Sequence, residues 1–389
     1  MKYKLSVMPF LVLLIQLSCA QESVSNLQYE DVTKTNLISN ALKSNTMDAA
    51  VVDIDKDGDL DVILAMEYVE NVILINDGKG RLVDESQNRF PRVRHDSEDI
   101  AVADFDNDGD LDIVFVSEDD QINEYYENKG NQLFQAANSK IPVRGTSNAV
   151  ETADLNGDGY SDLVVGNSGQ NYVLINDGLG SFNDETQTRL PYNSYTTQDI
   201  DLADIDGDGD LDIIEGNETF NRVLINNGKG FFADESSKRL PRVNDQTREI
   251  DLGDIDGDGD LDIICANVDF GGFGNPQNRL LLNDGTGVFS ELTEKLPQSS
   301  FRTVDIDFAD LNNDGVLDIL AGNRFNGHEK LAIIHDGKLN FTDQTSNMLP
   351  PLDMYVFDYQ FADFNNDGIN DIYLCGFRGG DKLLFGVSR

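Results

Sequence analysis

The stretch DIDGDGDLDII decides how this chain folds. It occupies Asp204–Ile214 and returns unchanged at Asp254–Ile264. Five related stretches begin at Asp53, Asp104, Asp154, Asp310 and Asp363, so seven copies recur at intervals of 50 to 56 residues. Regular spacing of this kind indicates a repeat architecture, in which each copy is one structural unit.

Each copy contains the pattern of four short β-strands. In the fourth copy, apolar and acidic residues alternate over Ile200–Asp204, and the segments Leu211–Gly216 and Arg222–Asn226 are rich in aliphatic residues. The turn NGKG then precedes a fourth segment, Phe231–Ser236. Four strands and a period near fifty residues are typical of a β-propeller blade, so we predict an all-β chain with almost no helix.

The seventh copy ends at Arg389, before a fourth strand. The missing strand has a counterpart near the N-terminus, where YEDVTKTNL at Tyr29–Leu37 matches FNDETQTRL at Phe182–Leu190 in residue type. The second of these segments contains the fourth strand of the third copy. We therefore predict a seven-bladed β-propeller of four-stranded blades, closed into a ring by an N-terminal strand that completes the last blade.

The repeated acidic loop has the pattern D-x-[DN]-x-D-G-x-x-D. Positions 1, 3, 5 and 9 are always Asp or Asn, and position 6 is always Gly, as in loops that bind Ca²⁺ through a sharp turn. Position 7 includes Val and Ile, so its backbone carbonyl is the expected ligand. Oxygen ligands without His or Cys favour Ca²⁺, and we predict up to seven bound ions.

The predicted ligands include four side chains and one carbonyl per loop. They are Asp53, Asp55, Asp57, Asp59 and Asp61; Asp104, Asp106, Asp108, Asp110 and Asp112; Asp154, Asn156, Asp158, Tyr160 and Asp162; Asp204, Asp206, Asp208, Asp210 and Asp212; Asp254, Asp256, Asp258, Asp260 and Asp262; Asp310, Asn312, Asp314, Val316 and Asp318; and Asp363, Asn365, Asp367, Ile369 and Asp371. Loops with Asn at position 3 have one negative charge fewer and should bind more weakly. The ions are expected to be structural.

The chain is strongly acidic, with 71 acidic and 29 basic residues and a net charge of −42. This charge excludes a nucleic-acid partner, because phosphates would be repelled. Cys265 and Cys375 lie in apolar, strand-like segments, and we predict buried free thiols rather than a disulfide.

Residues 1–20 are predicted to be a signal peptide, with Lys2 and Lys4 before a short apolar run at Val7–Leu17. An alternative is that LSC, ending at Cys19, is a relaxed bacterial lipobox and that Cys19 carries a lipid. Both routes predict export, either to the cell envelope or outer surface or into the medium. Residues 21–389 are expected to form one propeller domain, without a transmembrane helix and as a monomer.

The loop pattern, the repeat period and the INDGxGxF segment resemble the FG-GAP/VCBS repeat proteins, whose propeller is that of the integrin α-subunit head. The resemblance extends over about residues 27–389. The Phe-Gly…Gly-Ala-Pro signature itself is absent, which places the chain nearer the VCBS-like branch. The resemblance implies a Ca²⁺-stabilised propeller, often extracellular and engaged in adhesion or ligand binding, but it does not identify a ligand.

Differences between the copies should concentrate on the face opposite the acidic loops. The fifth copy has the longest insertion, Asn267–Arg279. The candidate ligand-binding residues on that face are Arg92, Arg94, Arg242, Arg248, Phe270, Phe273, Arg302 and Tyr355. They indicate either a recognition surface for a glycan or an envelope protein, or arginines that pair with nearby acids and aromatic residues that pack between blades.

A second set of acids stands five residues before six of the seven loops: Asp48, Asp99, Asp199, Glu249, Asp305 and Asp358. If the first strand of each blade lines the central channel, these side chains ring its mouth and could hold a cation. The alternative is that they are solvated residues at the starts of strands.

Catalysis is not expected from the sequence. The chain has three histidines and no nucleophile or phosphate-binding motif, and His335 replaces the Asn of a turn, where we expect it at the surface. We therefore predict a non-enzymatic binding or adhesion module. The alternative is a carbohydrate-active enzyme such as a polysaccharide lyase, which would use Arg, Tyr and His on an acidic glycan.

Overall fold

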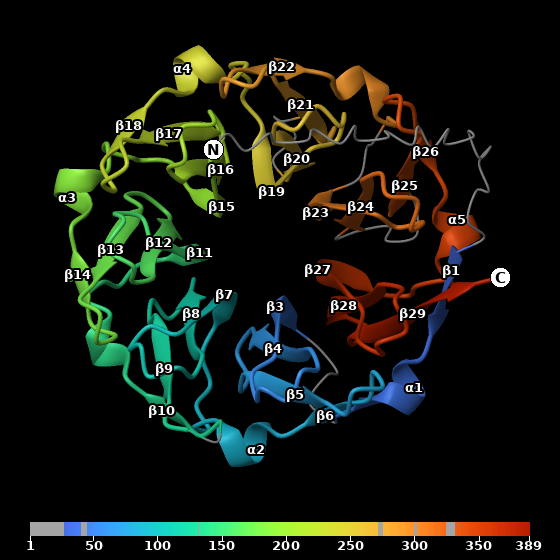
Figure 1. Ribbon diagram of the computed structural model, residues 1–389, viewed down its shortest axis with the longest axis horizontal. Helices are drawn as coiled ribbons and strands as arrows, with labels where there is room; N and C mark the ends of the chain where they lie inside the picture. The colour runs from blue at the N-terminus through green and yellow to red at the C-terminus, as the bar shows by residue number, and fades with distance from the viewer. Residues whose placement is uncertain (1–26, 40–44, 131, 271–274, 299–301, 324–330) are drawn as a thin grey trace, which may run out of the picture.

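The computed structural model describes residues 27–39, 45–130, 132–270, 275–298, 302–323 and 331–389. These residues form seven antiparallel sheets arranged in a ring around a central axis (Figure 1). The first strand of each sheet lies nearest the axis and the fourth lies at the rim. The predicted all-β, seven-bladed propeller is therefore confirmed.

The first three blades follow one another along the chain. Blade 1 consists of β3 (Thr46–Val52), β4 (Asp61–Met66), β5 (Val72–Asn76) and β6 (Leu82–Asp84); blade 2 of β7 (Ser97–Ala103), β8 (Asp112–Ser117), β9 (Glu124–Asn128) and β10 (Phe134–Ala136); and blade 3 of β11 (Ser147–Ala153), β12 (Asp162–Asn167), β13 (Tyr172–Asn176) and β14 (Phe182–Asp184). The fourth strands of these three blades are only three residues long, so their outer edges are short.

The remaining blades repeat this order, except for the last. Blade 4 consists of β15 (Thr197–Ala203), β16 (Asp212–Asn217), β17 (Arg222–Asn226) and β18 (Phe232–Asp234); blade 5 of β19 (Gln246–Gly253), β20 (Asp262–Val268), β21 (Arg279–Asn283) and β22 (Phe289–Glu291); blade 6 of β23 (Thr303–Ala309), β24 (Asp318–Asn323), β25 (Ala332–His335) and β26 (Phe341–Asp343); and blade 7 of β27 (Tyr355–Ala362), β28 (Asp371–Arg378), β29 (Lys382–Ser388) and β1 (Leu27–Asp31).

The N-terminal strand closes the ring, as predicted. β1 pairs antiparallel with β29, from Leu27 opposite Ser388 to Asp31 opposite Leu384. The buried Tyr29 donates a hydrogen bond from its hydroxyl to the carbonyl of Leu311 in the neighbouring blade, at 3.0 Å. The chain then continues through β2 (Leu37–Ile38), which pairs in parallel with β6 of blade 1. Blade 7 is therefore held to both of its neighbours.

The hydrophobic core consists of layers between the blades. Seven clusters of buried apolar side chains are found among the described residues, one at each junction between neighbouring blades. The second strands contribute most, because both of their faces are covered; β4, for example, is buried along its whole length. This explains why these strands are near-continuous aliphatic segments.

Single helical turns at the rim were not predicted. They are α1 (Thr33–Asn36), α2 (Ser86–Arg89), η1 (Asn138–Lys140), α3 (Thr186–Arg189), α4 (Ser236–Arg239), η2 (Thr293–Lys295) and α5 (Thr345–Met348), and each follows the fourth strand of a blade. One turn is too short to show a helical period in the sequence. None of the described helices has the length or composition needed to cross a lipid bilayer.

The strand order defines two faces. The acidic loops join the first and second strands, and they share one face, the loop face, with the turns between the third and fourth strands. The connections between the second and third strands, and the segments that cross from blade to blade, lie on the opposite face. The two described cysteines, Cys265 and Cys375, are buried and free, as predicted.

Candidate functional site

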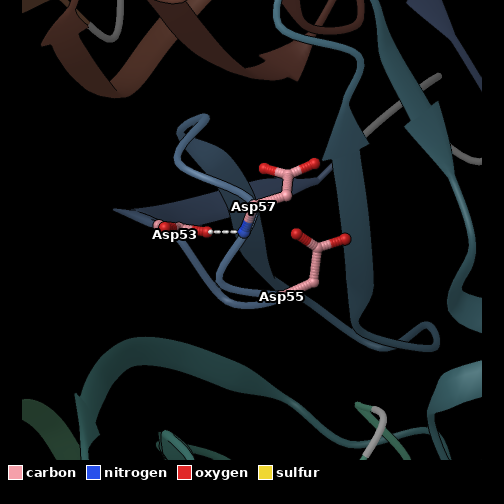
Figure 2. Close-up of side chains that lie close together, drawn as sticks. All are labelled: Asp53, Asp55 and Asp57. Atoms are coloured by element: carbon pink, nitrogen blue, oxygen red, sulfur yellow. Dashed lines mark hydrogen bonds between the residues drawn. The ribbon is translucent and has the colours of Figure 1, made fainter.

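Each acidic loop is folded around its first carboxylate. In blade 1, Asp53 accepts hydrogen bonds from the backbone N–H groups of Asp57 and Gly58 at 3.1 and 3.0 Å, and Asp57 accepts one from the N–H of Asp59 at 3.0 Å. Figure 2 shows the Asp53, Asp55 and Asp57 side chains around the curve of this loop. The backbone therefore supplies the curvature that a cation site needs.

Two positions in each loop have a left-handed backbone. Gly58 at position 6 has a φ of 96°, which explains the glycine that every copy has there. Position 4 has positive φ as well, at 62° for Lys56, and in the other loops it is Gly or Asn. The preference at position 4 is visible in the sequence and was missed.

Position 9 is the most buried carboxylate of each loop. Asp61 accepts the N–H of Ile54 at 3.1 Å and the N–H of Asn76 at 2.8 Å, and its side chain has no solvent exposure. Burial raises the pKa of Asp61 to about 7. The counterparts Asp112, Asp162, Asp212, Asp262, Asp318 and Asp371 are buried and accept the equivalent pairs of N–H groups.

Some carboxylate oxygens at position 3 lack a hydrogen-bond partner within the described part of the chain, and a cation could take that place. The Oδ1 atoms of Asp55, Asp106 and Asp206 are buried and have no hydrogen-bond partner among the described residues. Oxygens of positions 1, 3 and 5 in blades 1 and 2, and of positions 1, 3 and 9 in blades 4 and 5, lie within 4.8 Å of one another. Converging carboxylates with unsatisfied oxygens fit a hard divalent ion, so these acidic clusters could hold metal.

The three loops with Asn at position 3 differ chemically. In blade 3, Asn156 donates hydrogen bonds to Asp158 at 3.0 Å and to Asp162 at 3.3 Å. The amide thereby satisfies two carboxylates that would otherwise repel each other. For blade 3, this supports the expectation that a loop with Asn at position 3 binds a cation more weakly.

The side chains at position 7 turn away from the loop. They lie over the first glycine of the turn between the third and fourth strands, as Asp59 does over Gly78 and Tyr160 over Gly178. A Cβ on Gly178 would lie 2.7 Å from the Tyr160 ring, so this turn needs glycine for space as well as for its φ of 77°. This orientation is consistent with a role for the position-7 carbonyl rather than for the side chain.

The candidate ligand residues are distributed over the opposite face and do not form one patch. Arg92 pairs with Glu70 at 3.2 Å, with Arg94 4.0 Å from the same carboxylate, and Arg248 lies 3.7 Å from Glu218. The Arg302 guanidinium lies 5.4 Å from the centre of the Phe270 ring, and Tyr355 begins β27 half-buried. Phe273 lies outside the described residues.

Arg242 belongs to a cavity of about 340 Å³ between blades 4 and 5. Its guanidinium stacks on Phe220, 4.5 Å from the ring centre, and Tyr195 meets the same ring edge-on at 6.4 Å. These residues come from the blade crossovers and from the connection between β16 and β17, so the cavity belongs to the opposite face. It combines an aromatic wall with a fixed positive charge.

Two buried arginines form the inner part of this cavity. Arg222 pairs with Glu215 at 2.9 Å and with Asp234 at 3.2 Å, and Arg279 pairs with Asp245 at 2.9 Å and with Glu291. The Oδ1 atom of Asp245 is buried without a partner among the described residues. The sequence contained an indication of this site. Arg222 and Arg279 are each the first residue of a third strand that continues with three aliphatic residues.

The central channel contains a second acidic region, in a cavity of about 270 Å³. Its lining includes the six predicted acids Asp48, Asp99, Asp199, Glu249, Asp305 and Asp358, together with Glu98, Glu151, Asp201 and Asp307. Arg248 is the only basic residue among the described lining residues. The acids before the loops therefore line the central channel.

Several channel carboxylates connect neighbouring blades. Asp99 accepts the N–H of Val150 in the next blade at 2.6 Å, and Asp199 accepts the N–H of Ile250 at 2.8 Å. Burial, assisted by neighbouring acids, raises the pKa of Asp199 to about 7 and that of Glu151 to about 8. Protons are therefore held in the channel at pH values where exposed carboxyls are ionised.

The expectation for His335 was wrong. The side chain is buried, stacks on Phe341 at 4.8 Å, and accepts the N–H of Leu339 through Nε2 at 2.6 Å. Its counterpart in blade 1, Asn76, accepts N–H groups at the same distance along the chain through its amide oxygen. His335 is thus an internal acceptor, and burial lowers its pKa.

We predict that substitutions at positions 3 and 9 of the loop have different effects: position 3 matters only when Ca²⁺ is bound, whereas position 9 matters for folding with or without the ion. Asp55→Ala should lower the melting temperature in 1 mM Ca²⁺ by the equivalent of roughly 1–2 kcal/mol and should change it little in EDTA, because its Oδ1 has no hydrogen-bond partner among the described residues. Asp61→Ala should lower the melting temperature both with Ca²⁺ and in EDTA, by the equivalent of roughly 3 kcal/mol in the free energy of unfolding, because two N–H groups lose their acceptor. Thermal unfolding monitored by circular dichroism provides the measurement.

Asp59→Ala is the matched control, because its side chain points away from the loop. It should bind as many Ca²⁺ ions as the wild type. Equal losses for Asp55→Ala with and without Ca²⁺ would contradict a metal-binding role of position 3.

We also predict that the channel makes stability depend on pH. The folded-state pKa values of Glu151 and Asp199 lie above their ordinary values, so the folded protein holds more protons than the unfolded chain. The stabilisation that these two carboxyl groups contribute to the folded state is therefore complete below about pH 4, and it is lost as the pH rises through about 7 to 8. At saturating Ca²⁺, the double variant Glu151→Gln, Asp199→Asn should melt higher than the wild type at pH 8.5, and this advantage should shrink toward pH 5.5. A constant difference across that range would refute the role of these two groups.

Solved structures of other proteins have a fold similar to that of this chain. An Agrocybe aegerita lectin, described as recognising non-reducing terminal N-acetylglucosamine, superposes with a TM-score of 0.50 at 22% identity and covers 77% of this chain and 79% of its own. BBS1N, solved in complex with ARL6DN, superposes with a TM-score of 0.58 at 11% identity, covering 94% of this chain and 98% of its own. At these identities the likeness shows the fold alone. No curated protein matches the sequence significantly.

The family model of the FG-GAP-like repeat matches residues 53–115, 104–165, 154–215, 214–265 and 267–321, which together make up more than half of the chain. These segments contain the acidic loops of blades 1 to 6. The chain therefore belongs to the FG-GAP-like repeat family of β-propellers.

Proposed function

We propose that this protein is an exported, Ca²⁺-binding propeller that acts as a non-enzymatic binding module. Its ligand is a glycan, held on the face opposite the acidic loops. The observation that carries this proposal is the cavity between blades 4 and 5, where Arg242 stacks on Phe220 and two buried arginines are fixed by ion pairs.

The cavity has the chemistry that sugar binding needs. Its volume of about 340 Å³ is within the range of small-ligand pockets. Phe220 and Tyr195 offer aromatic surface to the C–H face of a sugar ring, and Arg242 offers donors to hydroxyl or carboxylate oxygens. A lectin among the structural neighbours demonstrates that a propeller of this general fold can bind a glycan.

Binding of a protein is the alternative class of partner. BBS1N was solved in complex with another protein, so the fold also accommodates partners of this kind. The concave, partly aromatic cavity favours a glycan, because protein partners usually bury a larger and flatter surface.

We propose that Ca²⁺ occupies the seven loops as a structural ion. With a dissociation constant near ~10⁻⁴ M, each site at about 1 mM Ca²⁺ would contribute roughly 1.4 kcal/mol. The loops lie on the face away from the cavity, so the ions would stabilise the blades without touching the ligand.

The proposal places no catalytic chemistry in the cavity. Its two lining carboxylates, Asp234 and Asp245, each pair with an arginine, and no histidine is among the described lining residues. A glycoside hydrolase or lyase would need an acid and a base that are free to exchange protons with the substrate.

The test uses a panel of acidic and neutral polysaccharides in 1 mM Ca²⁺, with retention and chain length measured in the same samples. The wild type should retain at least one glycan without shortening it. Arg242→Ala should weaken retention about tenfold, because it removes a stacked guanidinium from the cavity wall. Arg92→Ala, an exposed arginine on the same face, should bind like the wild type.

Three outcomes would count against the proposal. Equal binding by wild type and Arg242→Ala would exclude the cavity as the site. Shortened chains with new absorbance from an unsaturated uronate would identify a lyase. Retention of no glycan at all would favour a protein partner.

Export is tested by the intact mass of the protein recovered from the cells that produce it. The mass should correspond to a chain lacking residues 1–20, or to one that begins with a lipidated Cys19. A full-length chain in the cytosol would contradict export.

A further inference from the structure

Three carboxylates meet at the junction of blades 1 and 2, far from the acidic loops. Glu67 follows β4, Asp96 precedes β7, and Glu98 is the second residue of β7. One oxygen of each lies within 4.8 Å of the others. All three belong to the opposite face, and Glu98 also lines the central channel.

Asp96 is the buried member of this cluster, with 2% of its surface exposed. Its Oδ2 accepts the N–H of Asp119 at 2.7 Å, whereas its Oδ1 is buried and has no hydrogen-bond partner among the described residues. An unsatisfied carboxylate oxygen is costly in the interior of a protein. The cluster therefore contains an acceptor that the described residues leave unused.

The backbone holds the cluster together. Glu67 and Asp96 form an isolated antiparallel bridge between the two blades, and the N–H of Glu67 donates to the carbonyl of Asn45 at 2.9 Å. The carboxylates are therefore brought together by main-chain hydrogen bonds despite their mutual repulsion. Burial, with Asp96 as the largest charge contribution, raises the pKa of Glu98 to about 8.

The other junctions show what this position usually contains. At the junction of blades 3 and 4 the equivalent residues are Ser168, Thr196 and Gln198, and Ser168 and Thr196 form the same isolated bridge. These residues are neutral.

The junction of blades 4 and 5 has one acid and one base. Its equivalent residues are Glu218, Gln246 and Arg248, and the Arg248 guanidinium lies 3.7 Å from Glu218. At that junction a positive side chain takes the place that Glu98 has between blades 1 and 2.

We propose that Glu67, Asp96 and Glu98 bind a divalent cation at the mouth of the channel, separate from the loop sites. The ligand set is three carboxylates without His or Cys, which selects a hard ion such as Ca²⁺. The ion takes the role that the Arg248 guanidinium has between blades 4 and 5, where it lies beside Glu218 and supplies a positive charge. This inference does not depend on the proposed glycan site.

The test counts the Ca²⁺ ions bound per chain by equilibrium dialysis. Asp96→Asn and Glu98→Gln should each bind one ion fewer than the wild type, with all loop sites intact. Glu118→Gln is the matched control: it removes a neighbouring charge that acts on Glu98 but supplies no oxygen to the cluster, so it should bind the full number.

A second variant gives a readout that does not require counting. Glu98→Arg copies the arrangement of Glu218 and Arg248, so it should raise the melting temperature in EDTA, where the wild type has no ion. The advantage should shrink or reverse at saturating Ca²⁺. The proposal is overturned if Asp96→Asn and Glu98→Gln bind as many ions as the wild type, or if Glu98→Arg shifts the melting temperature equally in EDTA and Ca²⁺.

Discussion

Each blade depends on one buried carboxylate, the ninth residue of its acidic loop. Asp61 accepts one N–H from the start of the loop and another from the end of the third strand, so it joins three segments of the blade. The same contacts recur in all seven blades, up to Asp371 in the last. Because this Asp is buried, a substitution affects both the fold of the blade and the electrostatics of its acidic loop.

Neighbouring blades are connected by hydrogen bonds between polar side chains and the backbone. Asn76 donates to the carbonyls of Leu60 in its own blade and of Phe364 in blade 7, and Asn226 does the same toward blade 3. In the channel, Asp99 and Asp199 accept N–H groups from the next blade. The apolar layers supply cohesion, and these directional contacts fix how far each blade is rotated from its neighbour.

The features that repeat along the chain could be predicted from the sequence. The period predicted the number of blades, and the match between Tyr29–Leu37 and Phe182–Leu190 predicted the closing strand. The acidic loops were recognised by the same comparison, and Val316 and Ile369 at position 7 led to the prediction that a backbone carbonyl, not a side chain, is the ligand there. These inferences needed only comparison of one copy with another.

Features that depend on contacts between blades were not predictable in the same way. The cavity beside Arg242 and the convergence of Glu67 with Asp96 require knowing which connections lie side by side across a junction. His335 was misjudged because its ring accepts the hydrogen bond that an Asn accepts elsewhere, and residue type alone does not reveal this substitution. The sequence also could not show which partners the crossover arginines have: Arg92 pairs with Glu70, Arg248 lies near Glu218, and Arg242 stacks on Phe220.

The pairing of β1 with β29 also constrains how the protein is made. β1 is synthesised before the other strands of the propeller, and it must remain without its partner until β29 has left the ribosome. Throughout that interval β1 has an open hydrogen-bonding edge, because the strand that pairs with it has not yet been made. Completion of the ring is thus a late event that requires the first and last strands of the propeller. A nascent chain interrupted before β29 would carry an unpaired β1 that other chains could capture.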